Sequence, residues 1–163
     1  MPFIEQLKAF LGKSSKNRVA ILGIGSPIRG DDAVGLHVIK KLREHDMDNV
    51  LILETQTVPE SFTSVLRKFA PTHVLMIDAA HMDAEPGVTR IIPTQMISDV
   101  CISTHKLPLT VLSNYLEGTM GAKVTLIGIQ PNSIAFGTSM TEELKATARE
   151  ITETIYEAIF QKS

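Results

Sequence analysis

The segment between Val19 and Gly35 constrains the fold of this chain more than any other stretch. It reads Val-Ala-Ile-Leu-Gly-Ile-Gly-Ser-Pro-Ile-Arg-Gly-Asp-Asp-Ala-Val-Gly, an apolar run that ends in a glycine loop and leads into a helical pattern. Such loops often bind phosphate, because the N–H groups at the helix start attract anions. Here two adjacent carboxylates, Asp31 and Asp32, occupy the helix start and would repel a phosphate. The segment therefore predicts an α/β ligand site for a cation or a neutral peptide.

Strand and helix patterns alternate along the rest of the chain. Strands are expected at residues 18–24, 49–54, 73–77, 88–92 and 123–129, and helices at 2–12, 31–44, 61–69, 108–116 and 141–160. This alternation implies a mainly parallel, twisted sheet of about five strands with helices on both faces. We therefore predict an α/β fold with a single domain, in which residues 1–17 add an amphipathic helix and a link to the main body, residues 18–163.

Composition excludes several classes of protein. The formal net charge of −2 creates no field for binding nucleic acid, and no apolar run approaches the ~20 residues of a membrane span. The chain does not open with a secretory signal pattern. Its one cysteine, Cys101, has no partner for an internal disulfide and is expected to be a small filler rather than a nucleophile. We therefore expect a cytoplasmic protein that acts on neither nucleic acid nor a membrane.

Polar residues follow four of the predicted strands. These are the loop Gly23–Asp32, Gln56, Asp78 and Gln130. Ligands of open α/β sheets bind beyond the carboxyl ends of the strands. These residues are therefore expected to converge on one edge of the sheet, although they are far apart in the sequence.

The acidic residues at this edge differ in what they predict. An acid at a helix start commonly caps backbone N–H groups, but one acid is enough for that, and adjacent side chains point in different directions. We expect one of the pair to cap the helix and Asp32 to face the crevice. Asp78 ends a buried strand, where a carboxylate is costly without a partner. A functional role and a loop hydrogen bond both remain open for Asp78.

One of the five histidines stands out by its position. His105 lies in Ser103-Thr-His-Lys-Leu-Pro-Leu109, directly before a predicted helix, from which its ring can point across the sheet edge. The remaining histidines are expected at surface or incidental positions: His37, His45, His73 and His81.

Asp32, Asp78 and His105 together make a three-point site for a divalent ion, with further positions open to substrate or water. Imidazole suits nickel and zinc whereas carboxylates suit harder ions, so the donors alone do not select the metal. The chain has no His-Glu-x-x-His and no Gly-x-Ser-x-Gly, which disfavours a thermolysin-like enzyme and an α/β-hydrolase. It also lacks the Asp-Thr-Gly or Asp-Ser-Gly of pepsin-like proteases.

Four segments, in this order, resemble the [NiFe] hydrogenase maturation endopeptidases, most closely the branch that serves formate-hydrogenlyase hydrogenases. They are Gly23-Ile-Gly25 with Gly30-Asp-Asp32, then Ile77-Asp-Ala79, then Ser103-Thr-His-Lys-Leu-Pro-Leu109, and last Leu126-Ile-Gly-Ile-Gln-Pro131 followed by Phe136. The resemblance runs from about Arg18 to the C-terminus and leaves out only the N-terminal helix and its link.

The resemblance implies that residues 18–163 form a peptidase domain. Its substrate would be the precursor of a hydrogenase large subunit, from which it removes a C-terminal extension after nickel insertion. The family's metal-binding positions fall on Asp32, Asp78 and His105, and its catalytic carboxylates on Asp32 and Asp78. The nickel is implied to arrive with the precursor. Hydrolysis by a carboxylate acting as general base and hydrolysis assisted by the ion both remain open.

The chain departs from the family pattern in the glycine loop. The family commonly has Asn after the second loop glycine, whereas this chain has Ser26 followed by Pro27, and Ala33 stands where the family has Gly. Neither change touches a proposed ligand. One alternative is a non-catalytic sensor or chaperone that recognises nickel loading while another protein cuts. A nucleotide-binding domain is a weaker alternative, because the loop lacks the Walker Lys-Ser/Thr.

Overall fold

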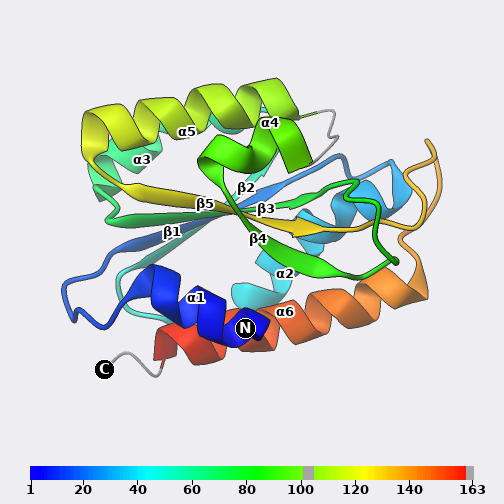
Figure 1. The fold of residues 1–163 in the computed structure, drawn as a ribbon, viewed down its shortest axis with the longest axis horizontal. Helices are drawn as coiled ribbons and strands as arrows, with labels where there is room; N and C mark the ends of the chain where they lie inside the picture. Colours follow the sequence, from blue (N-terminus) through cyan, green and yellow to red (C-terminus); the bar gives the residue numbers. More distant parts are fainter. Residues whose placement is uncertain (101–104, 161–163) are drawn as a thin grey trace.

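A five-stranded sheet forms the centre of the computed structural model, which describes residues 1–100 and 105–160 (Figure 1). The strand order is β2-β1-β3-β5-β4. The strands are β1 (Val19–Ile24), β2 (Val50–Gln56), β3 (His73–Ala79), β4 (Thr89–Pro93) and β5 (Lys123–Ile129). The first three and β5 run parallel, and β4 pairs antiparallel with β5 at one edge. The predicted α/β fold with a mainly parallel sheet is confirmed.

Helices cover both faces of this sheet. In Figure 1, α1, α2 and α6 lie on one face and α3, α4 and α5 on the other. Their bounds are α1 (Phe3–Leu11), α2 (Val34–Leu42), α3 (Thr63–Phe69), α4 (Ile97–Val100), α5 (Lys106–Met120) and α6 (Glu142–Phe160). The two-sided cover explains why the central strands are continuous apolar runs, since every residue of β1 and β3 is buried.

Two apolar clusters fill the space between the sheet and its helices. Alternate residues of a strand face opposite sides, so Ile21 packs in the cluster shared with α1, α2 and α6. Its neighbour Leu22 packs in the cluster shared with α3, α4 and α5. Leu7 and Leu11 of α1 are 0% and 1% exposed within the first cluster. The N-terminal helix therefore belongs to the core of the molecule.

The topology places a crevice between β1 and β3. From β1 the chain proceeds through α2 to β2 on one side, whereas the strands that follow β3 lie on the other side. Ligands of doubly wound sheets bind at such a switch point, outside the carboxyl ends of the strands. The residues that follow β1 and those that end β3 are thus the ones placed to share a site.

The predicted elements need correction mainly at their ends. The expected helix 31–44 is a 3-10 turn at Gly30–Ala33 followed by α2, and no side chain caps the start of either element. The expected helix 108–116 is longer, because Pro108 fits the first turn of α5, where free N–H groups need no partner within the helix. The predicted strands agree with the observed ones to within two residues. Cys101 lies outside the described residues.

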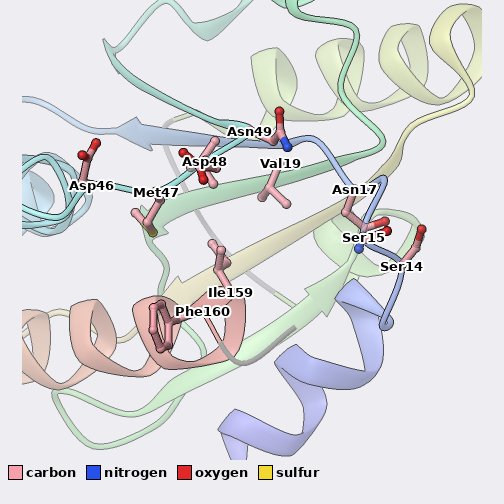
Figure 2. Close-up of a pocket in the computed structure, with 11 residues that line it drawn as sticks. Ser14, Ser15, Asn17, Val19, Asp46, Met47, Asp48, Asn49, Ile159 and Phe160 are labelled. Atoms are coloured by element: carbon pink, nitrogen blue, oxygen red, sulfur yellow. The ribbon is translucent and has the colours of Figure 1, made fainter. Parts of the chain in front are cut away.

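A cavity of about 270 Å³ lies at the opposite end of the sheet, where β1 and β2 begin (Figure 2). Figure 2 shows Val19 and Asn49 lining it together with Ile159 and Phe160 from the end of α6. It is remote from the crevice between the carboxyl ends of β1 and β3. Within the described ranges, no helix is both long enough and apolar enough to cross a membrane.

Candidate metal centre

Asp78 faces the crevice because side chains alternate between the two faces of the sheet along β3. Val74 and Met76 face the layer of α3 and α5, and Asp78 follows them on the same side of the strand. Asp78 is 1% exposed, and its Oδ2 atom lies 3.2 Å from Nδ1 of His105. The carboxylate is therefore held beneath the start of α5.

His105 immediately precedes α5. Its backbone carbonyl accepts a hydrogen bond from the Leu109 amide at 3.0 Å, which fixes the residue at the helix entrance. The ring is buried, with the residue 6% exposed. Nε2, the second ring nitrogen, lies 4.0 Å from Oδ2 of Asp32. The imidazole thus stands between the two carboxylates.

Asp32 enters the crevice from the glycine loop after β1. Its Oδ2 atom accepts a hydrogen bond of 2.8 Å from the backbone N–H of Ser26. Gly25 makes this close loop possible, because its φ is +145° and a Cβ there would collide with the Asp32 backbone carbonyl. The loop glycine therefore positions the acid, and the expectation that Asp32 faces the crevice is confirmed.

The two carboxylates raise the pKa of His105 above its usual value. The hydrogen bond with Asp78 is the largest cause, burial of the ring opposes it, and the negative charges of Asp78 and Asp32 add to it. The imidazolium form is favoured because it compensates the acids around it. The site is therefore built to hold positive charge.

The residues fit a divalent ion. Oxygen or nitrogen donors bind such ions at about 2.0–2.2 Å, so donors on one ion lie within about 4.4 Å of each other. One donor atom from each of Asp32, Asp78 and His105 lies within 4.8 Å of the others, and all three residues are buried. Small side-chain shifts suffice to bring the three donors onto one ion, which leaves further coordination positions for other ligands.

Asp31 has a different role from the one its sequence position indicates. It is fully buried but caps neither the 3-10 turn nor α2. Its carboxylate accepts hydrogen bonds from the backbone N–H groups of Asn132 at 2.9 Å, Ser133 at 3.2 Å and Thr141 at 2.7 Å. The Thr141 hydroxyl also donates to it at 3.0 Å. The expectation that one acid of the pair caps the helix is wrong, because Asp31 instead ties the loop 132–141 to the site.

Sequence analysis did not predict this tether, although one signal pointed to it. A single acid is enough to cap a helix, so the second acid of the pair had to find its hydrogen-bond partners elsewhere. The predicted cap Thr141 does accept a hydrogen bond from the Leu144 amide, at 3.4 Å, at the start of α6. Its simultaneous contact with Asp31 joins segments more than 100 residues apart, which no local pattern reveals.

Gln56 and Gln130 lie at the predicted edge of the sheet, where they form hydrogen bonds with its loops. The Gln56 carbonyl accepts the Gly25 amide at 2.9 Å, while the residue is exposed. The Gln130 side chain accepts the Met82 amide at 2.7 Å and donates to the Pro131 carbonyl at 3.3 Å. The shared edge is confirmed, but these two residues hold its loops in place through hydrogen bonds.

The four other histidines lie in other parts of the structure. His73 is buried beside Thr72, with 2.8 Å between Nδ1 and the Thr72 hydroxyl. His45 stacks on Tyr156 of α6, and His81 is exposed. The fourth, His37, lies in α2, where burial and nearby lysines lower its pKa.

The departures in the glycine loop leave the site geometry intact. Ser26 contacts Asp32 through its backbone N–H, which any residue except proline supplies. Ala33 has a φ of −82°, which does not require glycine.

Comparisons with known proteins give the family. A family model described as hydrogenase maturation protease, HycI, matches residues 36–158. A putative hydrogenase maturation protease of Methanocaldococcus jannaschii is 36% identical over 163 residues, covering 94% of this chain and 96% of the relative. The hydrogenase 3 maturation protease of Escherichia coli K12 is 30% identical over 140 residues, covering 85% and 86%.

A solved structure agrees in fold as well as in sequence. It is the crystal structure of a [NiFe] hydrogenase maturation protease, HycI, from Thermococcus kodakarensis, with a TM-score of 0.85 and 34% identity. The match covers 95% of this chain and 99% of that one. The family model, the Methanocaldococcus jannaschii relative and the shared α/β fold show that this chain belongs to the hydrogenase maturation protease family.

Proposed function

We propose that this protein is the endopeptidase that removes the C-terminal extension of a [NiFe] hydrogenase large-subunit precursor after nickel insertion. The observation that carries the proposal is the buried cluster of Asp32, Asp78 and His105 at the switch point of the sheet. In a chain of this protease family, such a cluster supplies both recognition of a cation and acid–base groups for hydrolysis.

Nickel enters this proposal as part of the substrate. Two carboxylates and one imidazole offer three donors, which leave coordination positions for ligands supplied by the precursor. Without the ion, only the single positive charge of the His105 imidazolium faces the carboxylates of Asp32 and Asp78. A divalent ion carried by the precursor neutralises both carboxylates and takes the place of the His105 proton. Cleavage is thereby made conditional on correct loading, in the cytoplasm where we expect the precursor to be assembled.

Hydrolysis adds water across the scissile peptide bond. A carboxylate of Asp32 or Asp78 takes the proton of the attacking water, and that proton passes to the departing amine. Asp32, Asp78 and His105 would hold the precursor's ion, which would then supply Lewis-acid polarisation of the scissile carbonyl. Both routes place the scissile bond beside the same three side chains, so both give the carboxylates a catalytic role.

Asp78→Ala tests the proposal. We expect the variant to fold but to leave a nickel-loaded precursor uncleaved, because the site loses one carboxylate and the hydrogen-bond partner of His105. Mass spectrometry of the precursor after incubation, with and without nickel, measures the cleavage. Asp48→Ala, at an exposed acid, is the control and is expected to cleave normally.

Two outcomes contradict the proposal in different ways. Normal processing by Asp78→Ala, with circular dichroism showing a folded variant, would show that the cluster of Asp32, Asp78 and His105 does not carry out the cleavage. A purified unmodified protein that binds the loaded precursor but yields no shortened product is a sensor of nickel loading rather than a peptidase.

A further inference from the structure

Two large apolar side chains are exposed on neighbouring loops beside the metal centre. Ile28 is 53% exposed in the glycine loop, and Phe136 is 72% exposed in the loop between β5 and α6. Single exposed apolar residues are ordinary, but clusters of them mark interaction sites. Whether these two residues form one surface depends on how their loops meet.

Backbone hydrogen bonds place the two loops side by side. The Gly137 amide, next to Phe136, donates to the Ile28 carbonyl at 2.7 Å. Close by, the Gly30 amide donates to the Thr138 carbonyl at 3.1 Å, and the Asp31 amide donates to the Ser133 carbonyl at 2.8 Å. Ile28 and Phe136 are thus carried on adjacent strips of backbone, although they are far apart in sequence.

The buried carboxylate of Asp31 fixes this arrangement. It accepts hydrogen bonds from the backbone at both ends of the second loop, at Asn132 and at Thr141. Charge-assisted hydrogen bonds are stronger than neutral ones, and a buried carboxylate is costly unless it is fully paired. The loop that carries Phe136 is therefore anchored at its start and its end.

The same loops lead directly to the metal centre. Ser26, two residues before Ile28, donates its amide to the Asp32 carboxylate at 2.8 Å. Asp32 itself follows Asp31 in the chain. Ile28 and Phe136, here called the Ile28–Phe136 patch, therefore lie on the two loops that the adjacent acids Asp31 and Asp32 join to the candidate cation site.

Charge complementarity indicates which partner covers this patch. The buried carboxylates Asp32 and Asp78 call for a cation that the partner presents, and a polypeptide that presents it must lie across the adjoining loops. We infer that the Ile28–Phe136 patch docks an apolar segment of the polypeptide that carries the metal ion to Asp32 and Asp78. The inference rests on the proposed function, in which that polypeptide is the hydrogenase large-subunit precursor.

Steady-state kinetics with a nickel-loaded precursor test the patch. Phe136→Ser is expected to raise KM about tenfold with kcat within about twofold, since docking contacts act equally on ground state and transition state. Ile28→Ser is expected to shift KM in the same direction. The matched control is Phe160→Ser, at a phenylalanine 63% exposed beside the remote cavity, which is expected to change neither constant. Melting temperatures verify that each variant folds.

A photo-crosslinking arm makes the test independent of cleavage. Benzoylphenylalanine replaces Phe136 in one sample and Phe160 in another, and each is irradiated with the nickel-loaded precursor. We expect a crosslink to the precursor at position 136 and none at position 160.

The outcomes separate this inference from the proposed function. If the unmodified protein cleaves the precursor but Phe136→Ser keeps its KM, the docking inference is overturned and the function stands. If the unmodified protein does not cleave, the function fails, and the crosslink at position 136 still decides the docking. A crosslink between two copies of the chain, equal crosslinking at both positions, or no crosslink overturns the docking inference.

Discussion

Asp31 and Asp32 are adjacent and both buried, but their carboxylates contact different parts of the molecule. Asp32 faces His105 across 4.0 Å, while Asp31 binds the backbone of a loop that joins β5 to α6. Successive residues in a helical turn point in different directions, so the side chains of this adjacent pair contact two different parts of the structure. The candidate metal centre and the loop beside it are therefore fixed by a single acidic pair.

His105 gives the protein a pH-dependent stability in the absence of metal. Its folded pKa is raised, first by the Asp78 hydrogen bond, so its contribution is fully present below the unfolded value of about 6.5. That contribution is lost as the pH rises through the raised folded pKa. We predict that His105→Gln costs more stability at pH 5.5 than at pH 8.5, measured by urea unfolding with a chelator present.

The exposed His81 supplies the control for this measurement. His81→Gln is expected to change stability little at either pH. A cost of His105→Gln that is equal at both pH values would show that the ring is held by packing alone.

At the scale of elements, the glycine loop is shaped by the loop that it meets. Gly30 has a φ of +54°, and a Cβ there would lie 2.6 Å from the Ser133 carbonyl oxygen. The turn Gly30–Ala33 and the loop 132–141 thus pack backbone against backbone. Glycine is needed for the conformation and also for the space.

Gly30→Ala and Gly121→Ala separate these two requirements. Gly121 ends α5 with a φ of +64°, and a Cβ at this position would face open space, so alanine there costs only the left-handed conformation, about 1–2 kcal/mol. Gly30→Ala meets the same conformational cost and also collides with the Ser133 carbonyl. We predict a larger loss of unfolding free energy for Gly30→Ala, measured by chemical denaturation. Equal losses would contradict the close approach.

At the scale of the whole molecule, α1 is part of the apolar layer that α2 and α6 form on one face (Figure 1). Leu7 is 0% exposed in this layer. Burial of both faces is what allows a central parallel sheet to be apolar throughout. The N-terminal helix therefore contributes to the stability of the fold that carries the candidate metal centre at its far edge.

Leu7→Ala measures that contribution. Removing a fully buried leucine side chain typically costs about 2–5 kcal/mol, which includes the cavity that it leaves. The control Glu5→Ala, at an exposed position of the same helix, is expected to stay within about 0.5 kcal/mol. Thermal and urea unfolding give both values, and a loss below about 1 kcal/mol for Leu7→Ala would mean that α1 detaches readily from the core.

Local patterns along the chain were enough to predict the elements and the edge of the sheet that carries the site. Apolar periodicity gave β5 with its observed bounds, residues 123–129, and glycines followed by acids marked the loop after β1. These patterns are local, because side-chain alternation and helix periodicity are set by neighbours in the chain. The three candidate ligands, Asp32, Asp78 and His105, could be proposed for the same reason, since each stands at the end or start of an element.

How those elements meet emerged only from the three-dimensional arrangement. It brought donors of three distant segments within 4.8 Å, and it gave Asp31 to the loop 132–141 instead of to its own helix. It also set Phe136 beside Ile28 through the Gly137 hydrogen bond. Contacts between distant segments depend on the order of the strands and on which buried polar groups still need hydrogen-bond partners. A local sequence pattern specifies neither of these.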